Sequence, residues 1–200
     1  MHNPALTRPG AGLLAGVTAW RSAVAASAFV GLGGAVATTD HPWSALSQQA
    51  NLFAGVVYLG LAVYPLIARD RAYEPRSPWL RGATTVLLAL VCVTYLTVIE
   101  GSLDSTWSLL EHLITPLAVL ADFVLVGRNQ ANVRWWHPLT WVLLPAVYLG
   151  YYLIARPGLY DSFLDPDADG FLGVVAAFLV AILAAGYALY GIARARTWWS

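Results

Sequence analysis

The stretch "SALSQQANLFAGVVYLGLAVYPLIA", residues 44–68, decides the solvent in which this chain folds, because it contains no charged residue. A helix needs about 20 predominantly apolar residues to cross the hydrocarbon core of a bilayer, and this stretch is long enough. The rest of the chain shares its character, since 58% of the 200 residues are hydrophobic, 11% are charged and the mean hydropathy is +0.62. The sequence therefore predicts an all-α, polytopic membrane protein.

Apolar runs bounded by polar residues predict six transmembrane helices, at approximately 18–38, 47–68, 79–99, 108–127, 138–155 and 171–193. No internal repeat, linker or low-complexity tract divides the chain, so residues 1–200 are expected to form a single membrane domain, a six-helix bundle. The first run contains Arg21, and a charge at mid-bilayer costs about 3 kcal/mol. We expect Arg21 at the headgroup level with its side chain reaching towards water, and residues 11–20 either at the interface or extending the helix.

A second interpretation of the N-terminus stays open. Arg8, an apolar stretch and the pattern Ala23-Val24-Ala25 are typical of a cleaved signal peptide. Under that interpretation only five spans remain.

The distribution of arginines predicts the orientation. They cluster before the first span, between the second and third, between the fourth and fifth, and after the sixth, whereas Arg156 is the only base in the alternate loops. Short cytoplasmic loops are enriched in basic residues. We therefore expect a multi-pass protein of the cell membrane with both termini in the cytoplasm.

Polar side chains at membrane depth are costly, and each is by default a candidate for function. The candidates are Ser47, Gln48 and Asn51 at the outer start of the second span, Glu100 at the end of the third, Glu111, His112, Thr115 and Asp122 on the fourth, and Arg21. On a helix, Ser47 and Asn51 share a face, and His112, Thr115 and Asp122 fall within roughly 80 degrees of one another. Both faces reach the outer third of the membrane, where they could meet.

A serine hydroxyl and a histidine in a partly dry cavity suggest nucleophilic chemistry. The histidine would take the hydroxyl proton of Ser47, and Asn51, Gln48 or a free backbone N–H would stabilise the oxyanion. The alternatives are that Ser47, or Ser44, caps the second helix, and that His112 forms an interhelical hydrogen bond.

The group that orients His112 is not assigned by the sequence. Glu100 could reach it from the third span, while Glu111 points roughly 100 degrees away from it. Asp122 lies about 15 Å along the axis from His112, which suits a water chain or a salt bridge to Arg21 better than direct contact.

No metal or other cofactor is expected. The loop "DPDADG", residues 165–170, begins like a calcium loop, but its twelfth position is Ala176 where a bidentate Glu is required, so its acids are expected to cap the sixth span instead. His137 is placed on the opposite membrane face from His41 and His112, which excludes a three-histidine zinc site. No glycine-rich phosphate loop or basic nucleic-acid surface is present, and the sequence gives no indication of an oligomeric state.

Three stretches, "SALSQQANLFAGVVYLG" (44–60), "EHLITPLAVLADFVL" (111–125) and "YDSFLDPDADGFLG" (160–173), together resemble the androgen-induced membrane hydrolase family and its bacterial six-span branch. The resemblance runs from roughly Ala45 to Gly191. It implies hydrolysis of fatty acid esters of hydroxy fatty acids, with Ser47 at the position of the family's threonine nucleophile, His112 at its histidine and Pro116 at the proline that follows. Asn51 and Asp122 match the pattern of the bacterial branch. Serine in place of threonine retains the hydroxyl and loses a methyl group.

These observations predict an integral membrane hydrolase of lipid esters, with Ser47 and His112 catalytic and Asn51, Gln48, Asp122, Glu100 and Thr115 in supporting roles. Its partners would be a lipid ester substrate and the bilayer. The alternative is a small transporter or lipid-binding protein in which His112, Asp122, Glu100 and Arg21 form an intramembrane relay.

Overall fold

The computed structural model describes residues 10–68 and 74–196, which form helices and no strand. Six helical segments are long and apolar enough to cross a membrane, which confirms the predicted fold class. Three are single helices at the start of the chain and one is a single helix at its end: α1 (Ala11–Thr38), α2 (Leu46–Ile67), α3 (Trp79–Thr97) and α9 (Phe171–Arg196).

The fourth and fifth spans are composite. The fourth runs through α4 (Thr106–Leu109), the π-helical turn η1 (Leu110–Ile114), α5 (Thr115–Ala121) and a second π-helical turn, η2 (Asp122–Val126). The fifth consists of α6 (His137–Trp141) and α7 (Leu143–Ala155). Two short helices lie outside the spans, the 3-10 helix η3 (Asn129–Asn132) and α8 (Asp161–Leu164).

The observed limits of five spans follow the expected ones closely, whereas α1 begins earlier than the expected first span. Residues 11–20 extend this helix, which runs without a break through the Ala23–Ala25 pattern and buries Val24, Ala25 and Ala28 in the core. Cleavage of the N-terminus as a signal peptide stays an open alternative.

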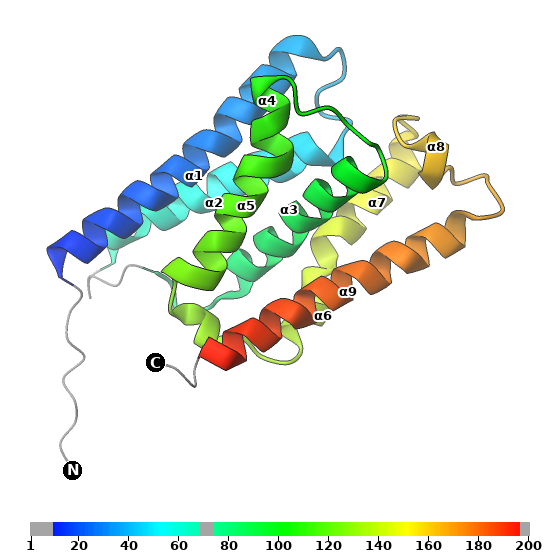
Figure 1. The fold of residues 1–200 in the computed structure, drawn as a ribbon. Coiled ribbons are helices and arrows are strands. Elements are labelled where there is room, and N and C mark those ends of the chain that lie inside the picture. Colours follow the sequence, from blue (N-terminus) through cyan, green and yellow to red (C-terminus); the bar gives the residue numbers. More distant parts are fainter. Residues whose placement is uncertain (1–9, 69–73, 197–200) are drawn as a thin grey trace.

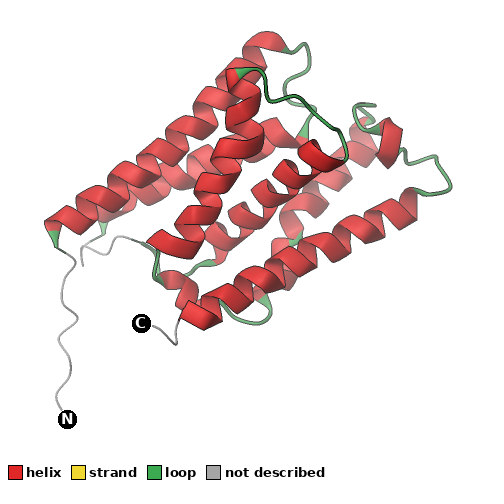
Figure 2. Ribbon diagram, in the orientation of Figure 1, coloured by secondary structure: helices red, strands yellow, loops and turns green. Residues whose placement is uncertain are grey.

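The helices form one bundle around α3, as Figures 1 and 2 show. The hairpin of α1 and α2 packs on one side of α3 together with the fourth span, and α6, α7 and α9 pack on the other. The starts of α1, α3 and α6 and the ends of α2 and α9 lie at one end of the bundle, which we call the terminal end. The starts of α2, α4 and α9 lie at the other.

The fully buried residues of α9 begin at Ile182 and continue through Gly186 and Leu189 to Ala193. The eleven residues before Ile182 include none, although Phe171, Val174 and Val175 pack against the cluster of Tyr148, Tyr152 and Leu164. A large cavity is formed on this side, and it includes Val175, Phe178 and Ile182 of α9.

Large aliphatic side chains remain exposed around the bundle, although a soluble protein would bury most of them. They include Val30, Val56, Leu59, Leu66, Leu125, Val147, Ile154, Leu172 and Val180. Such an exterior matches a hydrocarbon solvent and is consistent with a multi-pass membrane protein.

Candidate active site

The start of α2 places Ser47 inside the helix, one residue after it begins. The N-cap position is occupied by Ala45, which has no side-chain oxygen, so the expectation that Ser47 or Ser44 caps this helix is wrong. Ser47 is only 7% exposed, and within residues 10–68 and 74–196 its hydroxyl forms no hydrogen bond. It is thus a buried hydroxyl without a structural partner in the described chain.

Two tyrosines hold the start of α2 in place. The backbone N–H of Leu46 donates to the Tyr160 hydroxyl (3.2 Å), and the Tyr148 hydroxyl donates to the carbonyl of Ser44 (2.8 Å). Burial raises the pKa of Tyr160, which keeps its hydroxyl protonated. Tyr148 of α7 and Tyr160 in the segment that follows α7 therefore fix the start of α2 and with it Ser47, a role that the sequence did not reveal.

His112 lies on the π-helical turn η1 and is held by two contacts. Its Nδ1 is 3.0 Å from the carbonyl oxygen of Ser108, and because a carbonyl only accepts, Nδ1 carries the proton. Its ring stacks on Tyr95 with centroids 3.5 Å apart. The hydroxyl of Tyr95 in turn lies 2.9 Å from the Ser108 Oγ.

This arrangement leaves Nε2 as the basic nitrogen of the imidazole, and in the described chain it has no hydrogen-bond partner. The orienting group is therefore the backbone of Ser108, four residues before the histidine. Glu100, which the sequence left open as a group that could reach His112, is exposed in the loop after α3 and forms no hydrogen bond with it. The two are not brought together, since α3 ends at Thr97 and Glu100 adopts a left-handed conformation (φ 53°) in the loop that follows.

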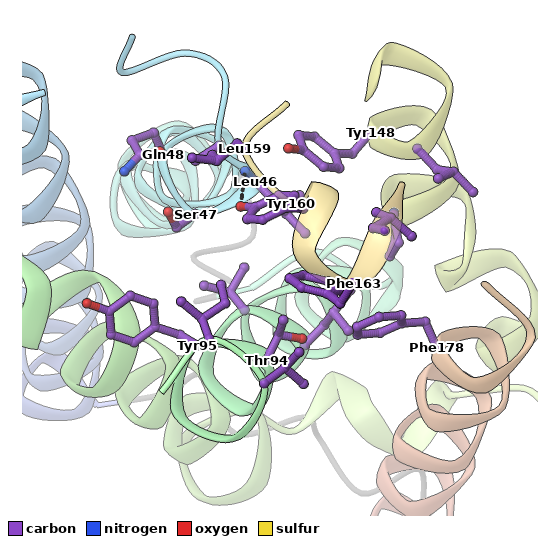
Figure 3. Close-up of a pocket in the computed structure, with 18 of the residues that line it drawn as sticks. Leu46, Ser47, Gln48, Thr94, Tyr95, Tyr148, Leu159, Tyr160, Phe163 and Phe178 are labelled. Carbon is purple, nitrogen blue, oxygen red and sulfur yellow. Dashed lines mark hydrogen bonds between the residues drawn. The ribbon is translucent and has the colours of Figure 1, made fainter. Parts of the chain in front are cut away.

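Ser47 and His112 line the same cavity, which has a volume of about 770 Å³. Figure 3 shows Ser47 on the side of α2 that faces Tyr95, with Tyr160 next to the start of α2 and Phe163 and Phe178 farther from it. Most of the lining is aliphatic or aromatic, and the volume is in the range of ligand pockets. No hydrogen bond joins Ser47 to His112 in the described structure.

The two amide side chains next to Ser47 are engaged in holding the helices together. Asn51 Nδ2 donates to the carbonyls of Ser47 (2.9 Å) and Glu111 (3.3 Å), and Gln48 Nε2 donates to Glu111 Oε2 (3.3 Å). Both hydrogens of Asn51 are used, so Asn51 is not a free oxyanion donor, contrary to expectation. It instead connects the backbone of Ser47 to the residue before His112.

The backbone N–H groups of Ser47 and Gln48 remain available. They lie in the first turn of α2, and within the described residues neither has an acceptor. Free N–H groups at a helix start favour negative charge. They are the best-placed donors for an oxyanion formed at Ser47.

A cluster of unsatisfied oxygen atoms lies where the start of α2 meets the fourth span. Gln48 Oε1, Asn51 Oδ1 and Glu111 Oε1 are all buried and have no hydrogen-bond partner. Glu111 is fully buried and forms no salt bridge among the described residues. The cluster has more acceptors than donors.

Asp122 lies near the terminal end in a cluster of charges that includes Arg21, Arg81 and Glu74. Arg21 Nε and Arg81 Nε donate to its two carboxylate oxygens (3.2 and 2.8 Å), and both arginines also contact Glu74 (3.1 and 3.2 Å). The suggested salt bridge between Arg21 and Asp122 is present. The expectation that Arg21 reaches towards water is wrong, because Arg21 is 0% exposed and compensated inside the bundle.

Thr115 faces α1 rather than the cavity, since its hydroxyl lies 2.7 Å from that of Ser27. His112 faces α3 and Asp122 faces both arginines, so the single polar face expected for the fourth span is wrong. A π-helical turn adds a residue to the helical turn, which changes the direction of the side chains that follow. Thr115 and Asp122 therefore have packing roles and do not contact His112.

The remaining predictions concern a metal site and the start of the sixth span. Among the described residues, no group of three or more His, Cys, Asp or Glu could hold a metal ion. The first turn of α9 contains no acid, and Asp167 pairs instead with Arg156 (2.7 Å), so the expected capping of the sixth span is wrong. Tyr95, Ser108 and Glu74 were not predicted from the sequence to belong to these sites. Ser108 lies four residues before His112, and this helical spacing could have indicated their contact.

Comparison with known proteins found no matching family model, no similar curated protein and no similar solved structure.

Proposed function

We propose that the protein is an integral membrane hydrolase of lipid esters that uses Ser47 as its nucleophile and His112 as its general base. The observation that carries this proposal is that an unpartnered serine hydroxyl and a histidine with a fixed tautomer line one apolar cavity. The resemblance of the sequence to the androgen-induced membrane hydrolase family supports it. That resemblance also suggests the substrate class, fatty acid esters of hydroxy fatty acids or similar lipids.

The proposed reaction has two stages. Ser47 Oγ attacks the ester carbonyl while its proton passes to His112 Nε2, and the oxyanion forms next to the free N–H groups of Ser47 and Gln48. The imidazolium then protonates the leaving alcohol, which leaves an acyl-enzyme. Water attacks this ester in the same way, with His112 again accepting the proton, and releases the fatty acid.

The surroundings of His112 suit this role. The Ser108 carbonyl holds Nδ1–H, which leaves the lone pair on Nε2, and His112 lines the cavity. A carbonyl stabilises an imidazolium less than a carboxylate does, so we expect modest turnover. Hydrogen bonds between nucleophile and base often tighten only when substrate is bound, so the absence of such a bond in the described structure is compatible with the proposal.

The cavity suits an acyl chain. Its lining comes largely from apolar residues of α3, α7, α8 and α9, and polar groups concentrate near α2. An acyl chain would lie among Phe163, Phe178 and Leu179, with its ester near Ser47. We further propose that the terminal end, which carries Arg76, Arg128, Arg134, Arg194 and Arg196, faces the cytoplasm of the cell, so that the cavity lies in the outer half of the membrane.

A second candidate function is lipid binding without hydrolysis, which the large apolar cavity alone would support. The relay considered from the sequence is less well supported. Arg21 and Asp122 are locked in a charge cluster near the terminal end, while Glu100 is exposed in the loop after α3. In the described structure no chain of hydrogen bonds connects them to His112.

The test is labelling of the purified protein with a lipophilic fluorophosphonate, followed by intact mass measurement. We expect one adduct on the native protein and none on Ser47→Ala. His112→Ala should react about 10² to 10⁴ times more slowly, which is the usual contribution of a general base. Ser162→Ala is the matched control, since Ser162 lines the same cavity but lies outside the proposed dyad.

An adduct that persists in Ser47→Ala would contradict the assignment of the nucleophile. If the native protein forms no adduct but retains a fatty acid ester unchanged through purification, the lipid-binding function replaces the hydrolase.

A further inference from the structure

A second hollow, about 850 Å³ in volume, lies at the terminal end of the bundle. It is formed by the segment before α3, the segment from η3 to the start of α6, and the last turns of α9. Among the described residues that line it, three are arginines and none is acidic: Arg76, Arg134 and Arg194. The proposed hydrolytic site uses none of these residues.

His137 supplies a fixed hydrogen-bond donor in this hollow. Its Nδ1 accepts the backbone N–H of Arg134 (3.2 Å), so in the neutral ring the proton is on Nε2. His137 is 5% exposed, its ring lies nearly perpendicular to that of Trp136 with the ring centroids 4.3 Å apart, and within the described residues Nε2 has no hydrogen-bond acceptor. The hollow thus combines a buried N–H donor with guanidinium groups.

The arginines are held at its walls by neighbouring residues. Asn132 Nδ2 donates to the backbone carbonyl of Arg76 (3.1 Å), and the guanidinium of Arg194 lies over the ring of Tyr190 (5.6 Å). The contrast with Arg21 and Arg81 is informative, because those two guanidinium groups meet carboxylates inside the bundle. Among the described residues, the side chains of Arg76 and Arg134 form no salt bridge, although both line the hollow.

The position of the hollow indicates the source of its ligand. The second, third, fifth and sixth spans begin or end at this level, so it lies where lipid headgroups meet water. Trp135, on its rim, is 64% exposed, as is typical of aromatic residues at the membrane interface. Guanidinium groups match the geometry of phosphate oxygens and accept them in pairs of hydrogen bonds.

We propose that this hollow binds the phosphate group of an anionic phospholipid from the adjacent leaflet. A zwitterionic lipid brings its own ammonium group into the same positive field, whereas an anionic headgroup does not. The hollow therefore selects phosphatidylglycerol-type lipids over phosphatidylcholine. The proposal does not depend on hydrolysis at Ser47.

The test is retention of lipid by the full-length protein, measured by native mass spectrometry after titration with phosphatidylglycerol or phosphatidylcholine. We expect preferential retention of phosphatidylglycerol, weakened about fivefold for each arginine replaced in Arg76→Gln and Arg134→Gln. Arg128→Gln is the matched control, because Arg128 is exposed at the same end and does not line the hollow. Arg134→Lys should retain part of the preference, since it keeps the charge and loses the paired geometry.

Equal retention of both lipids by the native protein would overturn the proposal. So would an Arg128→Gln variant that loses as much lipid as Arg134→Gln, because the effect would then belong to the general charge of this end. Displacement of the lipid by millimolar inorganic phosphate would assign the hollow to free phosphate instead. Both arginines are exposed, and circular dichroism of each variant checks that loss of lipid is not loss of fold.

Discussion

At the scale of single residues, the sequence was sufficient to single out Ser47 and His112, because polar side chains are rare in apolar segments. It was not sufficient to say what their neighbours do. Gln48 and Asn51 looked like free donors, but their amide nitrogens are engaged by Glu111 and by the backbone of Ser47. Such engagement depends on which helix packs opposite, and a single sequence does not contain that information.

The ring of Tyr95 should matter more than its hydroxyl for the reactivity of the candidate site. Tyr95→Phe keeps the ring that stacks on His112 and loses only the bonds to Ser102 and Ser108, whereas Tyr95→Leu loses the stacking. We expect Tyr95→Leu to slow fluorophosphonate labelling severalfold and Tyr95→Phe to slow it less. Labelling rates at equal protein concentration check this, and the reverse order would show that the hydroxyl positions the imidazole.

Replacing Glu111 by Gln should stabilise the protein. The carboxylate is fully buried with one oxygen unsatisfied, and the amide of Glu111→Gln removes the charge and offers donors to Gln48 Oε1 or Asn51 Oδ1. Satisfying a buried acceptor contributes about 1 kcal/mol to the free energy of unfolding. Thermal unfolding in detergent is the measurement. A lower midpoint would mean that the charge of Glu111 has a partner that the described chain does not provide.

At the scale of secondary-structure elements, hydropathy located the spans, because the length of an apolar run is set by the thickness of the bilayer. It did not reveal the π-helical turns in the fourth span, since an added residue leaves the composition unchanged. The directions of Thr115 and Asp122 were wrong for this reason. Turns of this kind are frequent at functional sites, and η1 carries His112 itself.

The contact between α1 and the fourth span depends on glycine at position 31. A Cβ at Gly31 would lie 2.8 Å from Glu111 Cγ, whereas a Cβ at Gly33 would meet open space. We expect Gly31→Ala to lower the free energy of unfolding by about 1–3 kcal/mol, as overpacking does. Gly33→Ala, on the same helix, should be neutral or stabilising by up to about 1 kcal/mol, because alanine favours helix.

Unfolding of both glycine variants in detergent is the comparison to make. Equal effects of the two substitutions would show that helix propensity, rather than contact with the fourth span, decides the outcome. Gly31→Ala should also slow labelling at Ser47, because the displaced residue precedes His112.

At the scale of the whole molecule, the six-span architecture was predictable from the composition and from the polar residues that bound the apolar runs. The charge cluster around Asp122 was predictable only in part. A pairing of Arg21 with Asp122 was one suggested solution, but Glu74 and Arg81 were not among the residues predicted to join it. Their participation follows from the packing of four separate chain segments.

Breaking this cluster should cost stability and leave the candidate site intact. Asp122→Asn removes one carboxylate from both Arg21 and Arg81, and removing one partner of a buried ion pair costs about 3–5 kcal/mol. The folded fraction should still label at Ser47, because His112 lies about 15 Å away along the helix. Loss of labelling without loss of stability would favour a relay through Asp122.

The burial of Arg21 also has a consequence for the order of events during synthesis. Its partners lie 53 residues later, at Glu74, and 101 residues later, at Asp122. At a translation rate of about 5–20 residues per second, Asp122 emerges roughly 5–20 s after Arg21. Until Glu74 has emerged, Arg21 has neither of these two carboxylates to meet, and the cluster is complete only once Asp122 follows. We therefore expect α1 to wait near the membrane surface and to reach its final depth only after the fourth span has entered.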